Sequence, residues 1–341
     1  MERRSVALAT ALIVLAVLGR ESTEAQSSFS GKTVRILVGS SAGGGFDTYA
    51  RAVARHLGRH MPGNPTVIVE NLPGAGGVIA ANQLYKVAKP DGLTLGHFVG
   101  SILFAQVLGR PGMEFETRKF EYLGAAAKED VVCALTRASG ITSVEKWMAA
   151  RTPVKLGGVG PGAPPDNTAR LLKATTALPI QLVAGYKGTA EIRLAAESGE
   201  VSGGCWTWDS VKVTWRKAIE SGEAVVVLQV TGKGSPDLPG VPQAIDLAKT
   251  DEARRLLQIG AHNAGAYGRP FVLPPGTPKD RVQLLRRAFQ DTLKDREFLA
   301  ECEKAKLTVD PMTGEELEKL IAELYTLDPA IVARLKEVLF N

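Results

Sequence analysis

Two glycine-rich turns contain the residues of this 341-residue chain whose types and spacing suit ligand chemistry. The first has the sequence Ser-Ala-Gly-Gly-Gly-Phe-Asp at residues 41–47, and the second has Asn-Leu-Pro-Gly-Ala-Gly-Gly at residues 71–77. Each turn follows a hydrophobic run and precedes a segment with helical character. The first N–H groups of a helix lack partners within it, and the helix dipole adds positive charge there. The two turns therefore predict a site for a small anion, formed largely by backbone groups.

Strands and helices alternate along the chain and would position these turns. Short runs rich in Val and Ile favour buried strands, and each is followed by a turn and then by a helical segment. Such alternation predicts α/β lobes with parallel sheets, whose ligands bind at the carboxyl ends of the strands. Five such units lie at residues 34–57, 67–87, 93–101, 154–172 and 180–196. The last two contain a third and a fourth glycine-rich loop, at residues 160–168 and 185–189.

The length of the chain exceeds that of one typical domain, and its 45% of hydrophobic residues can supply two cores. We expect two lobes. The first lobe is predicted to comprise residues 30–130 together with 231–341, and the second lobe residues 131–230.

The N-terminus has the three parts of a secretory signal peptide. Arg3 and Arg4 precede an apolar run at residues 6–18, and Thr-Glu-Ala at residues 23–25 suits a cleavage site. The apolar run is shorter than the roughly 20 residues that cross a membrane. We therefore predict a signal peptide at residues 1–25 and a periplasmic protein, with a retained membrane anchor as the alternative.

Several functional classes find little support in the sequence. The net charge of +5 is scattered, so no nucleic-acid partner is predicted. Glu70 follows the second strand as in a dinucleotide fold, but the glycines of the first turn are consecutive, and Asp47 would repel a phosphate. His56 and His60 are four residues apart without a metal-binding context. We predict no cofactor, no metal and no enzymatic activity.

The three cysteines are Cys133, Cys205 and Cys302. Their spacing does not suit zinc. Cys133 and Cys205 fall in strand-like segments, so they can form a disulfide in an oxidising compartment or remain buried thiols. The sequence leaves both alternatives open.

Six motifs occur in an order and at spacings that span almost all of the predicted mature chain. Together they resemble the Bug family, the substrate-binding proteins of tripartite tricarboxylate transporters. The pair of turns at 42–47 and 71–77 is the most specific part of this resemblance. The other motifs are Pro-Asp-Gly at 90–92, Gly-Tyr-Lys-Gly at 185–188, Asp-Leu-Pro-Gly-Val-Pro at 237–242 and Pro-Pro-Gly-Thr-Pro at 274–278.

The resemblance implies a type II periplasmic-binding-protein fold, in which two doubly wound α/β lobes are joined by two hinge strands. It implies capture of a small organic carboxylate between the lobes, partly through backbone groups, by a monomer that delivers it to the membrane components of a tripartite transporter. A secreted enzyme on the same fold, or a ligand-sensing receptor, is the alternative.

The chain departs from the family pattern at two places. In the first turn Ser41 replaces a proline, and Phe46 replaces a hydroxyl residue. The change at Phe46 adds apolar surface to the predicted site. Trp206 and Trp208 alternate, so we expect them on one face of a strand, either lining the cleft or packed in the core.

The predicted ligand-binding residues come from the four glycine-rich loops, from the end of the third strand and from the tryptophan segment. They are Ser41, Gly43, Gly44, Gly45, Phe46, Asp47, Gly74, Ala75, Gly76, Gly77, Ser101, Gly160, Gly162, Lys187, Gly188, Thr189, Trp206, Trp208 and Asp209. Lys187 would add a positive charge from the second lobe or lie on the surface. Asp47 is expected to cap its helix or to orient water molecules in the loop rather than to touch an anion directly.

Overall fold

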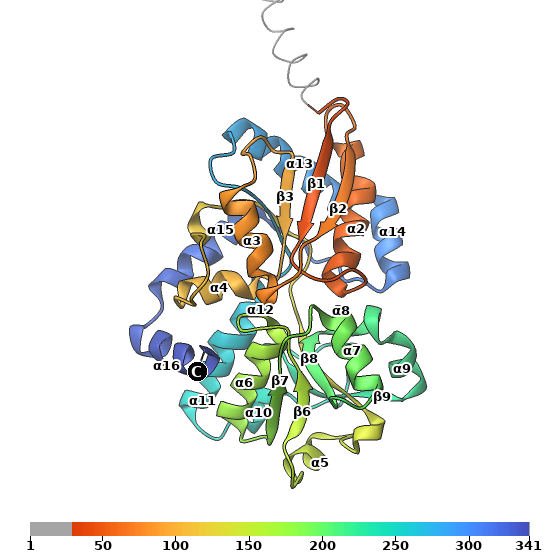
Figure 1. The fold of residues 1–341 in the computed structure, drawn as a ribbon, viewed down its shortest axis with the longest axis vertical. Coiled ribbons are helices and arrows are strands. Elements are labelled where there is room, and N and C mark those ends of the chain that lie inside the picture. The colour runs from red at the N-terminus through yellow and green to blue at the C-terminus, as the bar shows by residue number, and fades with distance from the viewer. Residues whose placement is uncertain (1–28, 341) are drawn as a thin grey trace, which may run out of the picture.

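The computed structural model describes residues 29–340, which form two α/β lobes (Figure 1). Within these residues the first sheet has six strands, in the order β11 (Met312–Thr313), β4 (Glu121–Ala125), β10 (Pro270–Leu273), β3 (Thr94–His97), β1 (Thr33–Val38) and β2 (Thr66–Asn71). The second sheet has five, in the order β7 (Ile180–Val183), β6 (Val154–Gly157), β8 (Gly203–Thr207), β5 (Val131–Thr136) and β9 (Ala224–Val230). The predicted fold class is confirmed, whereas the predicted signal peptide lies outside the described residues.

The two sheets are mixed, so the prediction of parallel sheets is wrong in part. β1, β2 and β3 are parallel, but β10 lies antiparallel between β3 and β4. In the second sheet β6, β7 and β8 are parallel, and β5 is antiparallel to β8 and β9. A strand that follows a crossover helix ends at the cleft between the lobes. β5 and β10 instead enter their lobes from the hinge, so they start at the cleft and run the opposite way.

Helix α2 (Gly45–Leu57) is held against the first sheet by one apolar face. Tyr49, Val53 and Leu57 recur every four residues and are buried with Val34 and Ile36 of β1. Each such burial contributes roughly 1.5–3 kcal/mol to stability, which fixes the start of α2 at the cleft. The other helices of this lobe are α3 (Val78–Lys86), α4 (Ser101–Val107), α13 (Lys279–Lys294), α14 (Arg296–Ala305) and α15 (Gly314–Glu323).

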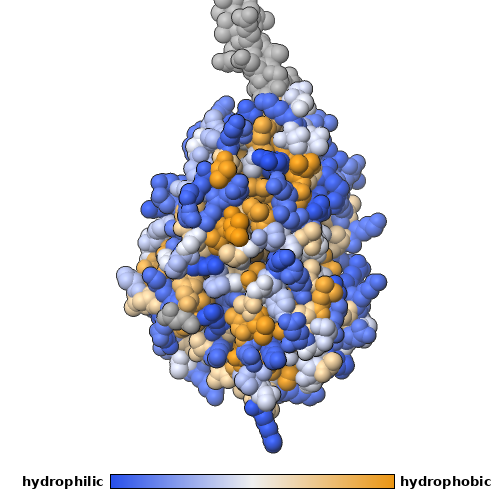
Figure 2. All heavy atoms as spheres, viewed as in Figure 1, coloured by the Kyte–Doolittle hydropathy of each residue, from blue (hydrophilic) through white to orange (hydrophobic). Residues whose placement is uncertain are grey.

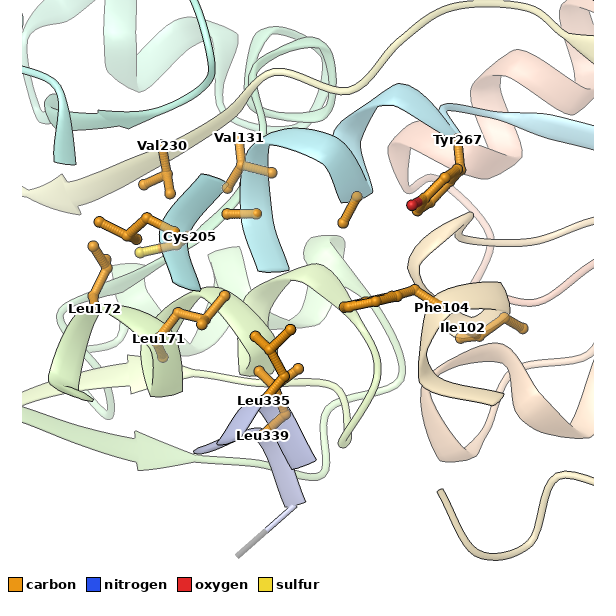
Figure 3. Close-up of a cluster of buried hydrophobic side chains, with 14 of the residues drawn as sticks. Ile102, Phe104, Val131, Leu171, Leu172, Cys205, Val230, Tyr267, Leu335 and Leu339 are labelled. Atoms are coloured by element: carbon orange, nitrogen blue, oxygen red, sulfur yellow. The ribbon is translucent and has the colours of Figure 1, made fainter. Parts of the chain in front are cut away.

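The second sheet is covered by helices on both faces (Figure 1). Their bounds are α5 (Val144–Met148), α6 (Pro164–Thr176), α7 (Thr189–Glu197), α8 (Trp208–Thr214), α9 (Arg216–Ser221), α10 (Ala244–Leu247), α11 (Asp251–Leu257), α12 (Ala264–Ala266) and α16 (Pro329–Phe340). Helices α10, α11 and α16 pack against α6. Figure 3 shows Leu335 and Leu339 of α16 beside Leu171 of α6, in one buried cluster.

These contacts run against the predicted assignment of all of residues 231–341 to the first lobe. Because α10, α11 and α16 pack on α6, we propose that residues 244–266 and 329–340 move with the second lobe. In this division α16 belongs to the second lobe, although the preceding helices α13, α14 and α15 belong to the first lobe. The rest of the predicted division stays a prediction.

Two adjacent segments connect the lobes, as the predicted hinge strands require. Residues 126–129 pair with residues 265–269 through backbone hydrogen bonds. Arg269 N–H donates to the Ala127 carbonyl (3.0 Å), Ala126 N–H to the Arg269 carbonyl (3.2 Å), and Glu129 N–H to the Gly265 carbonyl (2.9 Å). Glu129 is buried, and burial raises its pKa to about 7, against the opposing effect of the Arg269 charge.

Cys133 and Cys205 lie directly opposite each other on β5 and β8 and form a disulfide. Both residues are fully buried, and Cys302 is a buried free thiol on α14. The alternative that the sequence left open is thereby decided. The bond joins a strand that leaves the hinge to the strand that carries Trp206.

The face shown in Figure 2 mixes hydrophilic and hydrophobic side chains, and hydrophobic ones gather over the β1–β3 part of the first lobe. There Ile79 and Val87 are 46% and 63% exposed and line a shallow hollow with Leu37 and Leu72. None of the helices within residues 29–340 combines the length and the hydrophobicity needed to cross a bilayer.

Candidate functional site

A cavity of about 40 Å³ lies where the two lobes meet. A cavity of this volume is small, but it exceeds the roughly 10–15 Å³ that one bound water requires. The first lobe contributes Gly39, Ser40, Gly45, Phe46, Gly76 and Val99. The second lobe contributes Val159, Ala163, Pro164, Pro165, Gly188, Thr189, Trp206, Thr207 and Ser210.

The start of α2 forms one wall of the cavity. Its N-cap is Gly44, and no side chain in the described part of the chain caps the first turn. The N–H groups of this turn therefore remain available at the cleft. Gly45 approaches α8 so closely that a Cβ on it would overlap the Ser210 side chain and lie 2.9 Å from the Ser210 Cα. The two lobes are in direct contact at this point.

Asp47 lies behind the first turn and does not line the cavity. Its carboxylate accepts hydrogen bonds from the Gly43 N–H (2.8 Å), Arg51 Nε (2.9 Å) and Asn71 Nδ2 (2.9 Å). Burial raises the pKa of Asp47, but these bonds outweigh it and hold the pKa below its usual value. Because Asn71 also donates to the Ser40 carbonyl (3.0 Å), Asp47 and Asn71 join the two glycine-rich turns of the first lobe. Asp47 thus fixes the geometry of the two turns.

The second turn reaches the cavity through Gly76, and its backbone is strongly bent. Gly74, Gly76 and Gly77 have φ of 136°, 67° and 96°, in the region that favours glycine. A Cβ on Gly76 would lie 3.3 Å from the Gly160 carbonyl oxygen, so this turn also touches the opposite lobe. Ala75 is exposed, and its carbonyl accepts a hydrogen bond from Arg110 Nη2 (3.3 Å).

In the third loop, which precedes α6, backbone N–H groups are already bonded to side chains of α6. Asp166 accepts hydrogen bonds from the N–H groups of Val159 (2.7 Å) and Gly160 (2.8 Å). Asn167 Oδ1 accepts from the N–H of Gly162 (3.0 Å). The first two residues of α6, Pro164 and Pro165, have no N–H. The predicted binding residues Gly160 and Gly162 are therefore not placed to donate to an anion.

The fourth loop contributes Gly188 and Thr189 to the cavity, while the Lys187 side chain is exposed. The Lys187 carbonyl accepts a hydrogen bond from the Ser41 N–H (3.3 Å) across the cleft. The Lys187 N–H donates to the Glu191 carboxylate (2.9 Å). Of the two alternatives for Lys187, the structure favours the surface position. Ser41 and Lys187 join the lobes at the rim of the cavity.

Trp206 and Trp208 do not share a face, contrary to the expectation from their alternation. β8 ends at Thr207, and Trp208 is the first residue of α8. Trp206 lines the cavity, whereas Trp208 lines a separate hollow and donates from Nε1 to Asp237 (3.0 Å). The strand thus stops one residue too early for the alternation to continue.

Asp209 and Ser101 connect the lobes rather than line the cavity. The Asp209 carboxylate accepts hydrogen bonds from the Tyr49 hydroxyl (2.7 Å) and the Thr308 hydroxyl (2.8 Å). Burial raises the pKa of Asp209, but Arg269, Lys212 and these hydroxyls together hold it below its usual value. Ser101 Oγ donates to the Gly162 carbonyl (2.7 Å). Both contacts hold the lobes together.

Arg269 is the functional residue that sequence reasoning missed. It is fully buried, and its guanidinium lies 4.5 Å from the centre of the Phe46 ring and 4.2 Å from that of Tyr49. Its Nη2 donates to Thr207 Oγ1 (2.8 Å). Arg269 itself does not line the cavity. The missed residues that do line it lie in or directly beside predicted loops or strand ends, which is the signal that could have found them: Gly39, Ser40, Val99, Val159, Ala163, Pro164, Pro165, Thr207 and Ser210.

His56, Asp295 and Glu297 form a second cluster with the composition of a metal site. The guanidinium of Arg59 bonds to all three, and His56 Nε2 is 2.8 Å from a Glu301 carboxylate oxygen. With a cation already among these groups, the cluster fits an ion-pair network that fastens α2 to α14.

Comparison with known proteins matches residues 49–336 to the family described as "Tripartite tricarboxylate transporter family receptor". A UPF0065 protein in the gbd 5′ region of Cupriavidus necator is 26% identical over 98% of this chain and 96% of its own length. A UPF0065 protein in the ttuE–ttuC′ intergenic region of Agrobacterium vitis is 30% identical over 80% of this chain and 74% of its own.

Solved structures agree on the fold. The periplasmic binding protein BugD has a TM-score of 0.72 at 21% identity, covering 91% of this chain and 98% of its own. MatC from Rhodopseudomonas palustris with bound malate has a TM-score of 0.70 at 19% identity, covering 90% and 98%. A second R. palustris protein, with adipate, has a TM-score of 0.71 at 20% identity, covering 90% and 96%. The family is one of receptors rather than enzymes, so the enzyme alternative falls away.

Proposed function

We propose a function from one premise: the chain belongs to the receptor family of tripartite tricarboxylate transporters. It captures a small organic carboxylate in the cavity between its lobes. The ligand carboxylate lies at the starts of α2 and α3, where it accepts hydrogen bonds from backbone N–H groups. MatC and the adipate-bound protein, which share the fold, each hold a carboxylate.

The observation that carries this proposal is the uncapped start of α2 beside the bend at Gly76, both at one small cavity. A hydrogen bond to a charged group contributes roughly 1.5–3 kcal/mol, and a helix N-terminus contributes about 0.3–2 kcal/mol. Ordering of the lobes and of the ligand offsets much of this gain. A net of about −8 kcal/mol corresponds to micromolar affinity, which suits a scavenging receptor.

We further propose that the mature protein is a periplasmic monomer that delivers its ligand to the membrane components of such a transporter. The family description and the signal-like pattern at residues 1–25 support this placement. Residues 29–340 alone contain both lobes and the cavity, so capture does not require a second chain.

Calorimetry on the purified mature protein tests carboxylate capture. Mono-, di- and tricarboxylates that raise the melting temperature in a first screen would be titrated, each beside its neutral amide. We expect at least one acid to bind with micromolar affinity and its amide to bind at least 100-fold more weakly. Equal binding of acid and amide, or the absence of any binding acid, would contradict the proposal. Conversion of a bound acid into product would also contradict it.

A further inference from the structure

We infer that Trp206 and Ser210 form a donor pair that selects the ligand: a short monocarboxylic acid with a carbonyl oxygen near its carboxylate. This inference rests on the proposed function, because it takes the carboxylate to lie at α2 and α3. It concerns the other end of the ligand, which faces the second lobe.

The indole of Trp206 supplies one half of this pair. The residue is only 1% exposed, lines the cavity, and has no hydrogen-bond partner for Nε1 among the described residues. An indole N–H can only donate, and a buried donor without an acceptor is costly. The ring is fixed by stacking on Trp215, with a centroid distance of 5.6 Å. Trp206 therefore places a fixed donor without a protein acceptor in the wall of the cavity, and we assign its acceptor to the ligand.

The second half comes from the hydroxyls of Thr207 and Ser210. Arg269, which can only donate, gives its Nη2 protons to Thr207 Oγ1 (2.8 Å) and Ser210 Oγ (3.3 Å). The two hydroxyls also bond to each other (2.8 Å), with Thr207 as the donor. The Ser210 oxygen thus accepts twice, and its own proton is left to donate. Were the bond between the hydroxyls reversed, the Thr207 proton would be left instead, and both residues line the cavity.

The rest of the wall excludes other substituents. None of the cavity-lining residues in the described part of the chain is charged. An ammonium group would find no carboxylate there, and a second ligand carboxylate would find no cationic side chain. The Arg269 guanidinium does not line the cavity: it is covered by the Phe46 ring, and its Nη2 donates to the hydroxyls. A carbonyl oxygen has two lone pairs and no proton, so it can accept from both members of the donor pair.

The cavity volume sets the length of the ligand. At about 40 Å³ the cavity is small, which favours a short acid over a long one. Phe46, Val99 and Pro165 add apolar surface around it. A short oxo acid satisfies the volume, the charge and the donors together.

Two matched series of acids test the inference by calorimetry on the mature protein. The three-carbon series is pyruvate, lactate, propionate, alanine and malonate, and the five-carbon series is 2-oxovalerate, 2-hydroxyvalerate, valerate, norvaline and glutarate. In at least one series we expect the oxo acid to bind about tenfold or more tightly than every other member. If a dicarboxylate or an unsubstituted acid binds as tightly, the inference fails and the proposed function stands. If no carboxylate of any kind binds, both fail.

The variants Trp206→Phe and Ser210→Ala test the residues themselves. Each should reduce the preference for the oxo acid over the unsubstituted acid from about tenfold to within twofold. Trp208→Phe makes the same kind of change outside the cavity and should keep the preference. Circular dichroism and melting temperature check the fold of each variant. A preference that survives in both Trp206→Phe and Ser210→Ala would overturn the assignment.

Discussion

Helices α2 and α6 each have 13 residues, and each begins at the cavity, one from each lobe. α2 starts at Gly44 with its first N–H groups uncapped by side chains of the described residues. α6 starts with Pro164 and Pro165, which have no N–H, and Asp166 takes the donors of the preceding loop. The two helices thus have the same length but differ at their starts, because only α2 keeps backbone N–H groups that can donate to an anion.

The comparison shows that a glycine-rich loop before a helix is not by itself an anion site. Such a loop can bind an anion only if its backbone N–H groups are not already bonded to acceptors within the protein. In the first lobe Asp47 takes only the N–H of Gly43 and leaves the first turn of α2 open. We therefore place the charged end of the ligand in the first lobe and its neutral end in the second.

The largest expected effect comes from Gly45→Ala. The added methyl group would overlap Ser210, so the lobes cannot meet at the start of α2. We expect the affinity for the best carboxylate to fall at least 100-fold in calorimetry. The first lobe itself should keep its stability, because Ala is the better helix former by about 1 kcal/mol.

Gly44→Ala is the matched control for this variant. Gly44 has φ −80°, which any residue adopts, and a Cβ there would make ordinary contacts of 3.4 and 3.5 Å. The affinity of the Gly44→Ala variant for the best carboxylate should stay within about threefold of that of the parent protein. Equal losses in the two variants would show that closure at Ser210 is not what matters.

The second effect concerns Asp47→Asn. The change weakens the bonds to Arg51 and to the Gly43 N–H, so the two turns of the first lobe lose their fixed geometry. We expect about a tenfold loss of affinity, measured by calorimetry at neutral pH. Asp166→Asn alters a loop that does not donate to the anion, and its affinity loss should be smaller. The reverse order would show that the loop before α6, and not the start of α2, holds the anion.

Asp47 also predicts a pH dependence of stability. Because its pKa is lowered in the folded protein, its contribution is complete above the usual Asp pKa and is lost as the pH falls through the lowered value. The difference in unfolding free energy between the parent and Asp47→Asn should therefore be largest near neutral pH and shrink in acid. Urea denaturation at a series of pH values measures it. A difference that grows in acid would contradict the assigned interactions.

The smallest expected effect comes from Pro165→Ala, which returns an N–H to the second residue of α6. If the anion lies at α2, the affinity for a monocarboxylate should change less than threefold in calorimetry. The melting temperature should fall slightly, because the unfolded chain gains freedom worth about 0.4–1 kcal/mol. A tenfold loss or gain for a monocarboxylate would place the charged end at α6 instead.

The sequence predicts the strands and turns of the first lobe well because their signals are local. The hydrophobic runs at 34–38 and 67–69 correspond to β1 and β2, which are parallel as expected. The turns between these strands and their helices need glycine at positions such as Gly43 and Gly76, where φ is positive. Periodicity and turn chemistry both act over a few residues, so one sequence suffices to find them.

The remaining features depend on contacts between distant segments. Arg269 stands between a glycine and a proline, and nothing nearby indicates its burial, which follows from the central place of β10 in the first sheet. The return of α16 to α6 likewise depends on tertiary packing. The spent donors of Gly160 and Gly162 are a third case, because the roles of Asp166 and Asn167 appear only once α6 is folded.

The bond between Cys133 and Cys205 has a consequence outside the native state. The two residues are 72 positions apart, so the bond closes a loop that contains β6, β7 and most of β8. In the chain-entropy description a loop of this length restricts the denatured ensemble by about 4 kcal/mol. The first lobe has no such crosslink among its described residues. The disulfide therefore restricts the unfolded conformations of the second lobe, which presents Trp206 and Ser210 to the cavity, and leaves those of the first lobe unrestricted.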